Sequence, residues 1–188
     1  MRKFLILLFL PIVFGFSNPE YNEKSIIFHF EGIINEYRTS NGLHRISLDE
    51  SIKYFSDERC NDIIKDYSHK GFVEKVFNRG LKYSEAYENI VLFKIPTITN
   101  KPNYQHFKEI INEKGDTIVI ELKELNYVKN EMATGIVSNY NIAKYCFLKW
   151  KYSKNHNELL LNPNIKRFYL SHSYDESKTL YFCFIALN

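Results

Sequence analysis

The change of hydrophobic period along the chain constrains its fold more than any other feature of the sequence. Apolar residues recur at steps of three and four, the spacing of an amphipathic helix, over residues 25–37 and, after the capping residue Asp49, over residues 52–67. A third stripe covers residues 141–150. The last apolar runs, between residues 165 and 187, are β-rich and are joined by a short polar link, which predicts an antiparallel hairpin. Helices early and a sheet late predict the α+β class.

The middle of the chain carries weaker signals. Residues 68–88 are interrupted by glycines and predict a loop with a short helix. Further on, we expect a helix over Tyr104–Glu113 and a strand over residues 117–123, where apolar and polar side chains alternate.

The chain begins with a segment typical of a secretory signal peptide. Arg2 and Lys3 precede a 13-residue apolar run over residues 4–16, and the small residues Gly15 and Ser17 flank a cleavage point. The run is shorter than the roughly 20 residues that cross a bilayer. We therefore expect residues 1–17 to be removed, leaving a secreted or periplasmic protein without a stable membrane span. An uncleaved amino-terminal anchor is the alternative.

Composition excludes further classes of protein. With 45% hydrophobic and 25% charged residues, the chain is too apolar for a disordered protein. The net charge of +3 falls to +1 when the two cations of the leader are removed. Because binding to phosphates needs several clustered cations, we expect no nucleic-acid partner. The length of residues 18–188 fits a single domain.

Cysteine and histidine residues offer few local motifs. Three scattered cysteines, Cys60, Cys146 and Cys183, do not form a disulfide framework or a zinc knuckle. Each lies in an apolar stretch, so we expect small buried side chains, with one disulfide bridge as the alternative. Four of the six histidines are expected to have surface or packing roles: His29, His44, His106 and His172.

Short motifs follow one another in an order that is typical of one family. They are Ile34-Asn35-Glu36-Tyr37-Arg38 with Asn41-Gly42-Leu43 and Leu48-Asp49, then Ser68-His69, then Glu88-Asn89-Ile90, and finally Trp150-x-x-Ser153-x-x-His156 with Leu161-Asn162-Pro163. Together these motifs resemble the CAP superfamily (cysteine-rich secretory proteins, antigen 5 and pathogenesis-related proteins) in its bacterial form, also called the SCP domain. The resemblance extends from Phe28 to Leu187.

The resemblance implies a three-layer α-β-α sandwich with a central, mainly antiparallel sheet and a cleft lined by His69, Glu88, Ser153 and His156. Ser153 stands where animal and plant members carry a second acidic residue. Two imidazoles and one carboxylate suit Zn²⁺ or another divalent metal in an open site, so His69, Glu88 and His156 are the candidate ligands. The alternative is that Glu88 and His156 bond to each other and only tie the helices together.

Two departures from the family pattern stand out. Tyr87 precedes Glu88 where the family usually has glycine, which predicts a narrower cleft. The 60 positions from Ile90 to Trp150 exceed the spacing in bacterial relatives, which indicates an insertion at about residues 93–139. We expect it to fold over the domain as a small lobe near the cleft, and a flexible linker is the alternative.

The resemblance favours a binding function over catalysis. Most family members are regarded as binding modules, and the 15 Phe and 14 Tyr residues supply aromatic surface. We expect a non-catalytic module for a lipid, a small hydrophobic ligand or a protein partner. The alternative is a metal- or histidine-assisted hydrolase, with Glu88 or a histidine as general base and Ser153 as nucleophile on the helix face of His156. A purely structural domain with a vestigial cleft is the third possibility.

Overall fold

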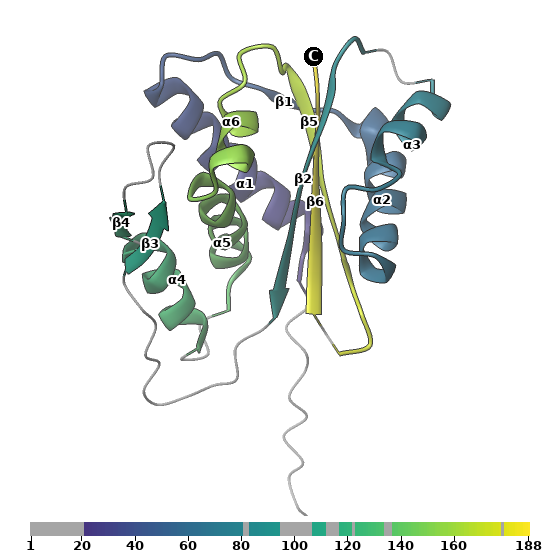
Figure 1. Cartoon of the computed structure of the whole chain (residues 1–188). Helices are drawn as coiled ribbons and strands as arrows, with labels where there is room; N and C mark the ends of the chain where they lie inside the picture. Colours follow the sequence, from purple (N-terminus) through teal and green to yellow (C-terminus); the bar gives the residue numbers. More distant parts are fainter. Residues whose placement is uncertain are drawn as a thin grey trace, which may run out of the picture.

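A sheet of four strands in the order β1-β5-β6-β2 forms the middle layer of the computed structural model (Figure 1). The structure describes residues 21–80, 83–94, 107–111, 117–121, 123–133, 137–177 and 179–188. The strands of this sheet are β1 (Ser47–Leu48), β2 (Ala86–Lys94), β5 (Arg167–Tyr174) and β6 (Thr179–Leu187). Strand β1 pairs with β5 in parallel, and the other pairs are antiparallel.

Helices cover both faces of the sheet, and Figure 1 shows the three layers. One face carries α1 (Glu23–Ser40), α4 (Lys123–Ala133), α5 (Asn139–Lys151) and α6 (Lys154–Leu160), while the other carries α2 (Lys53–Lys65) and α3 (Phe72–Asn78). A short 3-10 helix, η1 (Glu50–Ile52), precedes α2. The α+β class, the three layers and the mainly antiparallel sheet confirm the predicted fold.

The helices form where the sequence pattern places them. The Asn22 side chain caps α1 by accepting a hydrogen bond from the amide of Ser25, and Asp49 accepts one from Ser51 at the start of η1. The stripe of α1 turns Ile26, Phe30 and Ile34 into the core.

Aromatic rings join the sheet to the helix layer of α1 and α5. The ring of Phe30 lies 5.6 Å from that of Trp150, 6.0 Å from Phe168 and 5.4 Å from Phe184, measured between centroids. All four side chains are buried, so this cluster anchors α1 and α5 to strands β5 and β6.

The segment between β2 and α5 differs from the expectation. Residues 107–111, expected to be helical, form strand β3 (Phe107–Ile111), which pairs in antiparallel register with β4 (Thr117–Glu121). The expected helix over Tyr104–Glu113 is therefore wrong for these five residues, while the strand near residue 117 is confirmed.

The helix of this segment is α4, which packs against α5. Leu125, Val128 and Met132 of α4 belong to the main hydrophobic core. The insertion therefore contributes to the core and not only to a lobe at its rim, and its first expected residues, Phe93 and Lys94, are part of β2.

Residues 1–20, which include the expected signal peptide, lie outside the described part of the chain. Within that described part, the helices are too short or too polar to cross a membrane.

Candidate functional site

The candidate site lies at strand β2, which forms one edge of the four-stranded sheet. Because successive side chains of a strand point to opposite faces, Glu88 and Asn89 reach different helix layers. Glu88 contacts Arg59 of α2, while the Asn89 side-chain amide donates to the main-chain oxygen of His156 in α6 at 3.1 Å. The edge strand thus brings together residues from both layers.

Glu88 is a buried carboxylate with its hydrogen-bonding capacity in use. Its Oε1 accepts from Arg59 Nε at 2.7 Å and lies 3.4 Å from the thiol of Cys183. Its Oε2 accepts from Arg59 Nη2 at 3.3 Å and contacts His69 Nδ1 at 2.7 Å. The side chains of Arg59 and Glu88 are 2% and 1% exposed, so this is an ion pair shielded from water.

His69 lies in the loop between α2 and α3 and presents its ring to solvent. Its side chain is 54% exposed, although its Nδ1 contacts the buried Glu88. An ionised carboxylate only accepts hydrogen bonds, so His69 Nδ1 carries the proton of this contact. In its neutral form, the ring keeps the lone pair of Nε2 for another partner.

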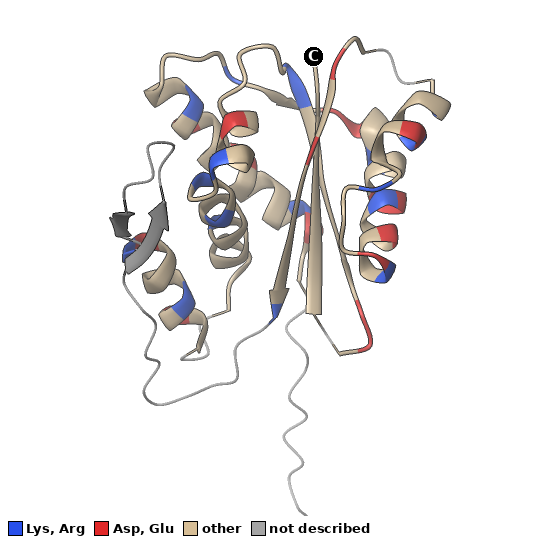
Figure 2. Ribbon diagram, viewed as in Figure 1, with Lys and Arg blue, Asp and Glu red and all other residues tan. Residues whose placement is uncertain are grey.

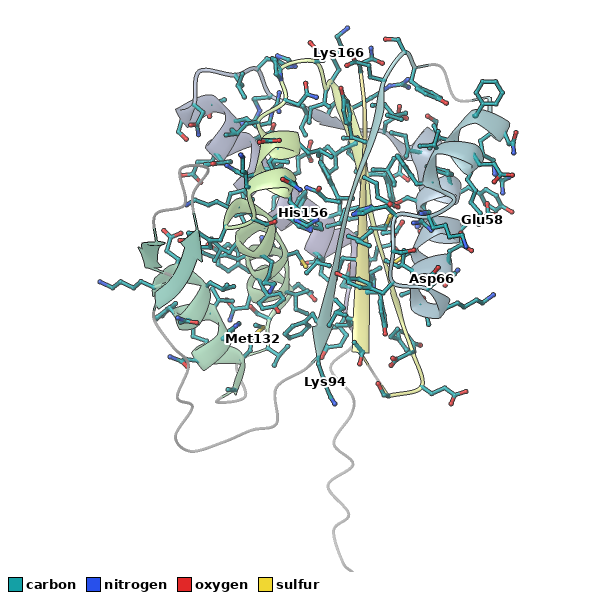
Figure 3. The ribbon with its side chains drawn as sticks, in the orientation of Figure 1. Glu58, Asp66, Lys94, Met132, His156 and Lys166 are labelled. Atoms are coloured by element: carbon teal, nitrogen blue, oxygen red, sulfur yellow. The ribbon has the colours of Figure 1, made fainter. Side chains whose placement is uncertain are left out.

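His156 sits in the first turns of α6, next to Ser153, and Figure 3 shows it near strand β2. The Ser153 hydroxyl lies 2.7 Å from His156 Nδ1. Burial lowers the pKa of His156, and electrostatic interactions with His69 and Lys149 lower this pKa further. His156 is therefore neutral at neutral pH.

The spacing predicted that Ser153 and His156 lie on one face of a helix. In the structure, Ser153 lies between two helices. Helix α5 ends at Lys151, and Ser153 is the residue that precedes α6. Its backbone is extended, with φ −116° and ψ 118°, and its hydroxyl contacts the His156 ring instead of capping the helix. The hydroxyl and imidazole nevertheless meet.

The structure thus brings all four predicted site residues together. The rings of His69 and His156 have centroids 6.4 Å apart, and they connect to Glu88 and Ser153 respectively. The contacts of Glu88 run to Arg59, His69 and Cys183, which is a different arrangement from a direct Glu88–His156 tie.

The arrangement of the side chains favours metal binding by His69 and His156 over binding by His69, His156 and Glu88 together. The ring centroids of His69 and His156 are 6.4 Å apart. With Zn–N bonds of about 2.1 Å, this separation fits one ion only at a linear N–Zn–N angle, so the two rings would have to approach by about 1 Å to form a tetrahedral site. A metal would compete with Arg59 and His69 for the oxygens of Glu88. Among the residues that the structure describes, no group of three or more His, Cys, Asp or Glu side chains is placed to hold a metal ion. Ligation by all three residues stays a prediction.

The fold has counterparts among solved structures. A cysteine-rich secretory protein from Staphylococcus aureus superposes with a TM-score of 0.51 and 10% sequence identity, over 90% of this chain and 40% of that one. An extracellular protein containing a SCP domain from Bacillus anthracis does so with a TM-score of 0.51 and 15% identity, over 87% of this chain and 41% of that one. The chain has the CAP/SCP fold. It spans about two fifths of either structure, and no family model or curated protein matches it.

Within this CAP/SCP fold, the first motif supports the site from a distance. Arg38 Nη1 donates to the main-chain oxygens of Leu160 at 2.8 Å and Asn162 at 3.0 Å, at the end of the helix that carries His156. The Asn35 side chain exchanges two hydrogen bonds with the backbone of Ile46, at 2.9 and 2.7 Å. These residues fix the loop after α1 and the end of α6.

The main-chain oxygen of Ile90 joins the two helix layers at the sheet edge. It accepts a hydrogen bond from the indole of Trp150 at 3.1 Å and one from the Tyr67 hydroxyl at 3.4 Å. The two side chains therefore cover an edge-strand acceptor that another strand would otherwise use.

Sequence reasoning missed Arg59, which contacts the predicted acid directly. Its signal was present: Arg59 falls on the buried stripe of α2 with Phe55, Cys60 and Ile63. A charged side chain at such a position needs a buried partner. The sequence did not say which carboxylate supplies it.

The remaining cysteine and histidine predictions have simple outcomes. Cys60, Cys146 and Cys183 are free and buried, as expected. His44 contacts the main-chain oxygen of Ile165 at 2.8 Å, and His172 stacks on Phe182, which are packing roles. His106 lies outside the described residues.

Proposed function

We propose that this chain is an extracytoplasmic binding module that holds a divalent metal ion with the Nε2 atoms of His69 and His156. The observation that carries the proposal is the 2.7 Å contact between His69 Nδ1 and Glu88. A carboxylate behind a histidine fixes the ring orientation and makes the other nitrogen a better ligand, an arrangement common in metal sites. When bound, Zn²⁺ would supply a Lewis acid with open positions for water or a ligand group.

His156 supports the same role. Its lowered pKa keeps the ring neutral at neutral pH, and neutral imidazole is the form that binds metals. A Ser153 hydroxyl that accepts from His156 Nδ1 leaves Nε2 as the ligand atom.

Export is supported by two independent observations. The first 17 residues have the pattern of a secretory leader. The two solved structures that share the fold are described as secretory and extracellular proteins. Mass spectrometry of the protein from its native host tests this part: a mature chain that begins at Asn18 supports it, and a retained Met1 contradicts it.

Two exposed apolar side chains, Tyr67 in the loop that carries His69 and Leu92 on strand β2, favour a ligand with a hydrophobic part. Tyr67 is 46% exposed and Leu92 39% exposed. The Tyr67 ring lies 6.2 Å from that of Tyr181. Binding of a fluorescent fatty-acid probe, with Tyr67→Ser as the weakened variant, tests this preference; equal affinity in both proteins contradicts it.

Calorimetric titration with ZnCl₂ tests the metal site. We expect one ion per chain, and a ligand at 100 times its Kd stabilises the fold by about 2.7 kcal/mol, which a rise in Tm reports. His69→Ala and His156→Ala should each abolish this binding. The matched control is His29→Ala, because His29 lies on α1 among the rings of Phe28 and Tyr140. Unchanged affinity in His156→Ala would contradict the proposal.

A second candidate, hydrolysis, is favoured by the Ser153–His156 contact of 2.7 Å. The pair has a hydroxyl and a neutral base within hydrogen-bonding distance. The nearby acid, Glu88, contacts His69 and not His156, so Glu88 is not the orienting carboxylate of a triad with His156. Labelling by a fluorophosphonate probe that is lost in Ser153→Ala would support hydrolysis, and equal labelling of both proteins would exclude Ser153.

A further inference from the structure

Arg59 contacts the His69 segment at two places at once. Its Nε and Nη2 atoms donate to the two oxygens of Glu88, at 2.7 and 3.3 Å, and Glu88 in turn contacts the His69 ring. The same Nη2 donates to the main-chain oxygen of Ser68 at 2.6 Å. One guanidinium therefore holds both the carboxylate behind His69 and the peptide group directly before it.

This arrangement is more than a tie between α2 and β2. Removing two charges from water carries a large desolvation penalty, and well-packed apolar side chains often stabilise a core equally well. Arg59 and Glu88 are buried, yet the third member of the group, His69, is 54% exposed. The buried pair thus ends at a side chain that solvent and ligands can reach.

Glu88 is the main ionic partner of Arg59, because the other carboxylates nearby are paired with other cations. Asp62 lies 3.8 Å from Arg59 Nη1, but it also forms an ion pair with Lys75 of α3. Lys75 and Arg79 both contact Glu58 as well, and Figure 2 shows the acidic and basic residues side by side on α2 and α3. These outer pairs neutralise the surface carboxylates around the buried group.

We propose that Arg59 is the positioning residue of this site: by holding Glu88 and the Ser68 carbonyl, it fixes His69 as the Nδ1–H tautomer and leaves Nε2 as the ligand atom. The link to metal binding rests on the proposed function. The tautomer itself is a property of the protein alone, because it follows from the Glu88 contact. A residue that only stabilised the fold would leave the tautomer unchanged in any variant that still folds.

The test is a long-range ¹H–¹⁵N spectrum of the histidine rings, recorded without metal at a pH where the rings are neutral. Wild type should show His69 as the Nδ1–H tautomer. Arg59→Gln should show a mixture of both tautomers and bind zinc at least tenfold more weakly. Arg59→Lys keeps the charge but loses the two-pronged contact, so it should also show a mixture of tautomers. This variant provides the test if Arg59→Gln does not fold.

The matched control is Arg167→Gln, which breaks an arginine–carboxylate pair with Asp49, 2.8 Å long, at the opposite sheet edge. It should leave the His69 spectrum unchanged. An unaltered Nδ1–H tautomer in folded Arg59→Gln or Arg59→Lys would overturn the inference. A wild-type Nδ1–H tautomer without zinc binding would instead refute the proposed function and leave the inference standing.

Discussion

Trp150→Phe offers a quantitative test of how the helix layers are joined at strand β2. The Trp150 side chain is 1% exposed, and its indole N–H donates to the main-chain oxygen of Ile90 at 3.1 Å. Replacement by Phe leaves a void of roughly 40 Å³, which at about 24 cal/mol per Å³ lowers the free energy of unfolding by about 1 kcal/mol. Loss of the hydrogen bond adds about 1 kcal/mol.

A second donor makes the effect non-additive. The Tyr67 hydroxyl also reaches the Ile90 oxygen, at 3.4 Å, so Trp150→Phe alone leaves this acceptor with a partner. Tyr67→Phe, which removes a long bond from a half-exposed side chain, should cost about 0.5 kcal/mol. The double variant leaves neither donor, and an unpaired buried acceptor costs 1–3 kcal/mol. We therefore expect the double variant to lose about 1 kcal/mol more than the sum of the single variants.

Urea denaturation followed by far-UV circular dichroism measures all four proteins. Fluorescence is unsuitable because Trp150 is the one tryptophan of the chain. Trp150→Phe should also lower Tm by about 4–8 °C, since 1 kcal/mol corresponds to about 2–4 °C in a domain of this size. Free energies that add within about 0.5 kcal/mol would refute the shared-acceptor reasoning, because independent sites behave in that way.

Three further predictions concern stability and reactivity. Met132→Ala on α4, at a fully buried position, should lower the free energy of unfolding by about 2–5 kcal/mol, whereas Tyr127→Ala, at a position that is 60% exposed, should change it by less than about 0.5 kcal/mol in urea denaturation. Glu23→Gln should cost about 0.5–1 kcal/mol at pH 7, because this carboxylate contacts Lys53 at 2.6 Å in a half-exposed pair. The contacts with Lys53 and Tyr169 lower the pKa of Glu23 despite its partial burial, so this stability is present above about pH 4.5 and is lost as the pH falls through the folded-state pKa, as urea denaturation over a pH series would show. Burial raises the pKa of the Cys146 thiol, so iodoacetamide should leave Cys146 unmodified in the native protein and modify it in urea, as mass spectrometry would show.

The helices and the final hairpin could be predicted because local periodicity determines them. The stripe of α1 needs no distant information to identify its buried face, and the runs of β5 and β6 are separated by a link short enough for direct pairing. Residues 107–111 are different, because the sequence Phe-Lys-Glu-Ile-Ile is compatible with a helix or a strand. Its pairing with β4 decides between them, and such tertiary context overrides propensity.

The candidate site could be predicted in part, because its motif residues stand in a recognisable order. The partner of Arg59 could not, since Glu88 is 29 positions away and on a different element. The break between α5 and α6 at Ser153 could not be predicted from the sequence either. Neither glycine nor proline marks the end of α5 at Lys151, so an unbroken helix through His156 fitted the spacing equally well.

Polar groups bridge the two helix layers at both edges of the sheet, and the two edges differ in the polar atoms that they leave open. Beyond Phe168, where its pairing with β1 ends, β5 carries Tyr169, whose hydroxyl donates to Glu23 at 3.0 Å. Lys53 lies 2.6 Å from Glu23 and 3.1 Å from Asp57, and these contacts raise its pKa despite partial burial. Burial, the dominant cause, raises the pKa of Tyr169 to about 12.

At this β5 edge the charges of Glu23, Lys53 and Asp57 are paired with one another, and the Tyr169 phenol stays protonated. The cluster therefore links α1 to α2 and leaves no charge unpaired within it. At the β2 edge the charges of Arg59 and Glu88 are also paired, but the Oε2 atom of Glu88 additionally contacts the exposed ring of His69. His156 stands beside that ring with a lowered pKa, which keeps its nitrogen available as an acceptor at neutral pH. A site that binds a metal or a ligand needs such open acceptors, and the β2 edge supplies them where the β5 edge does not.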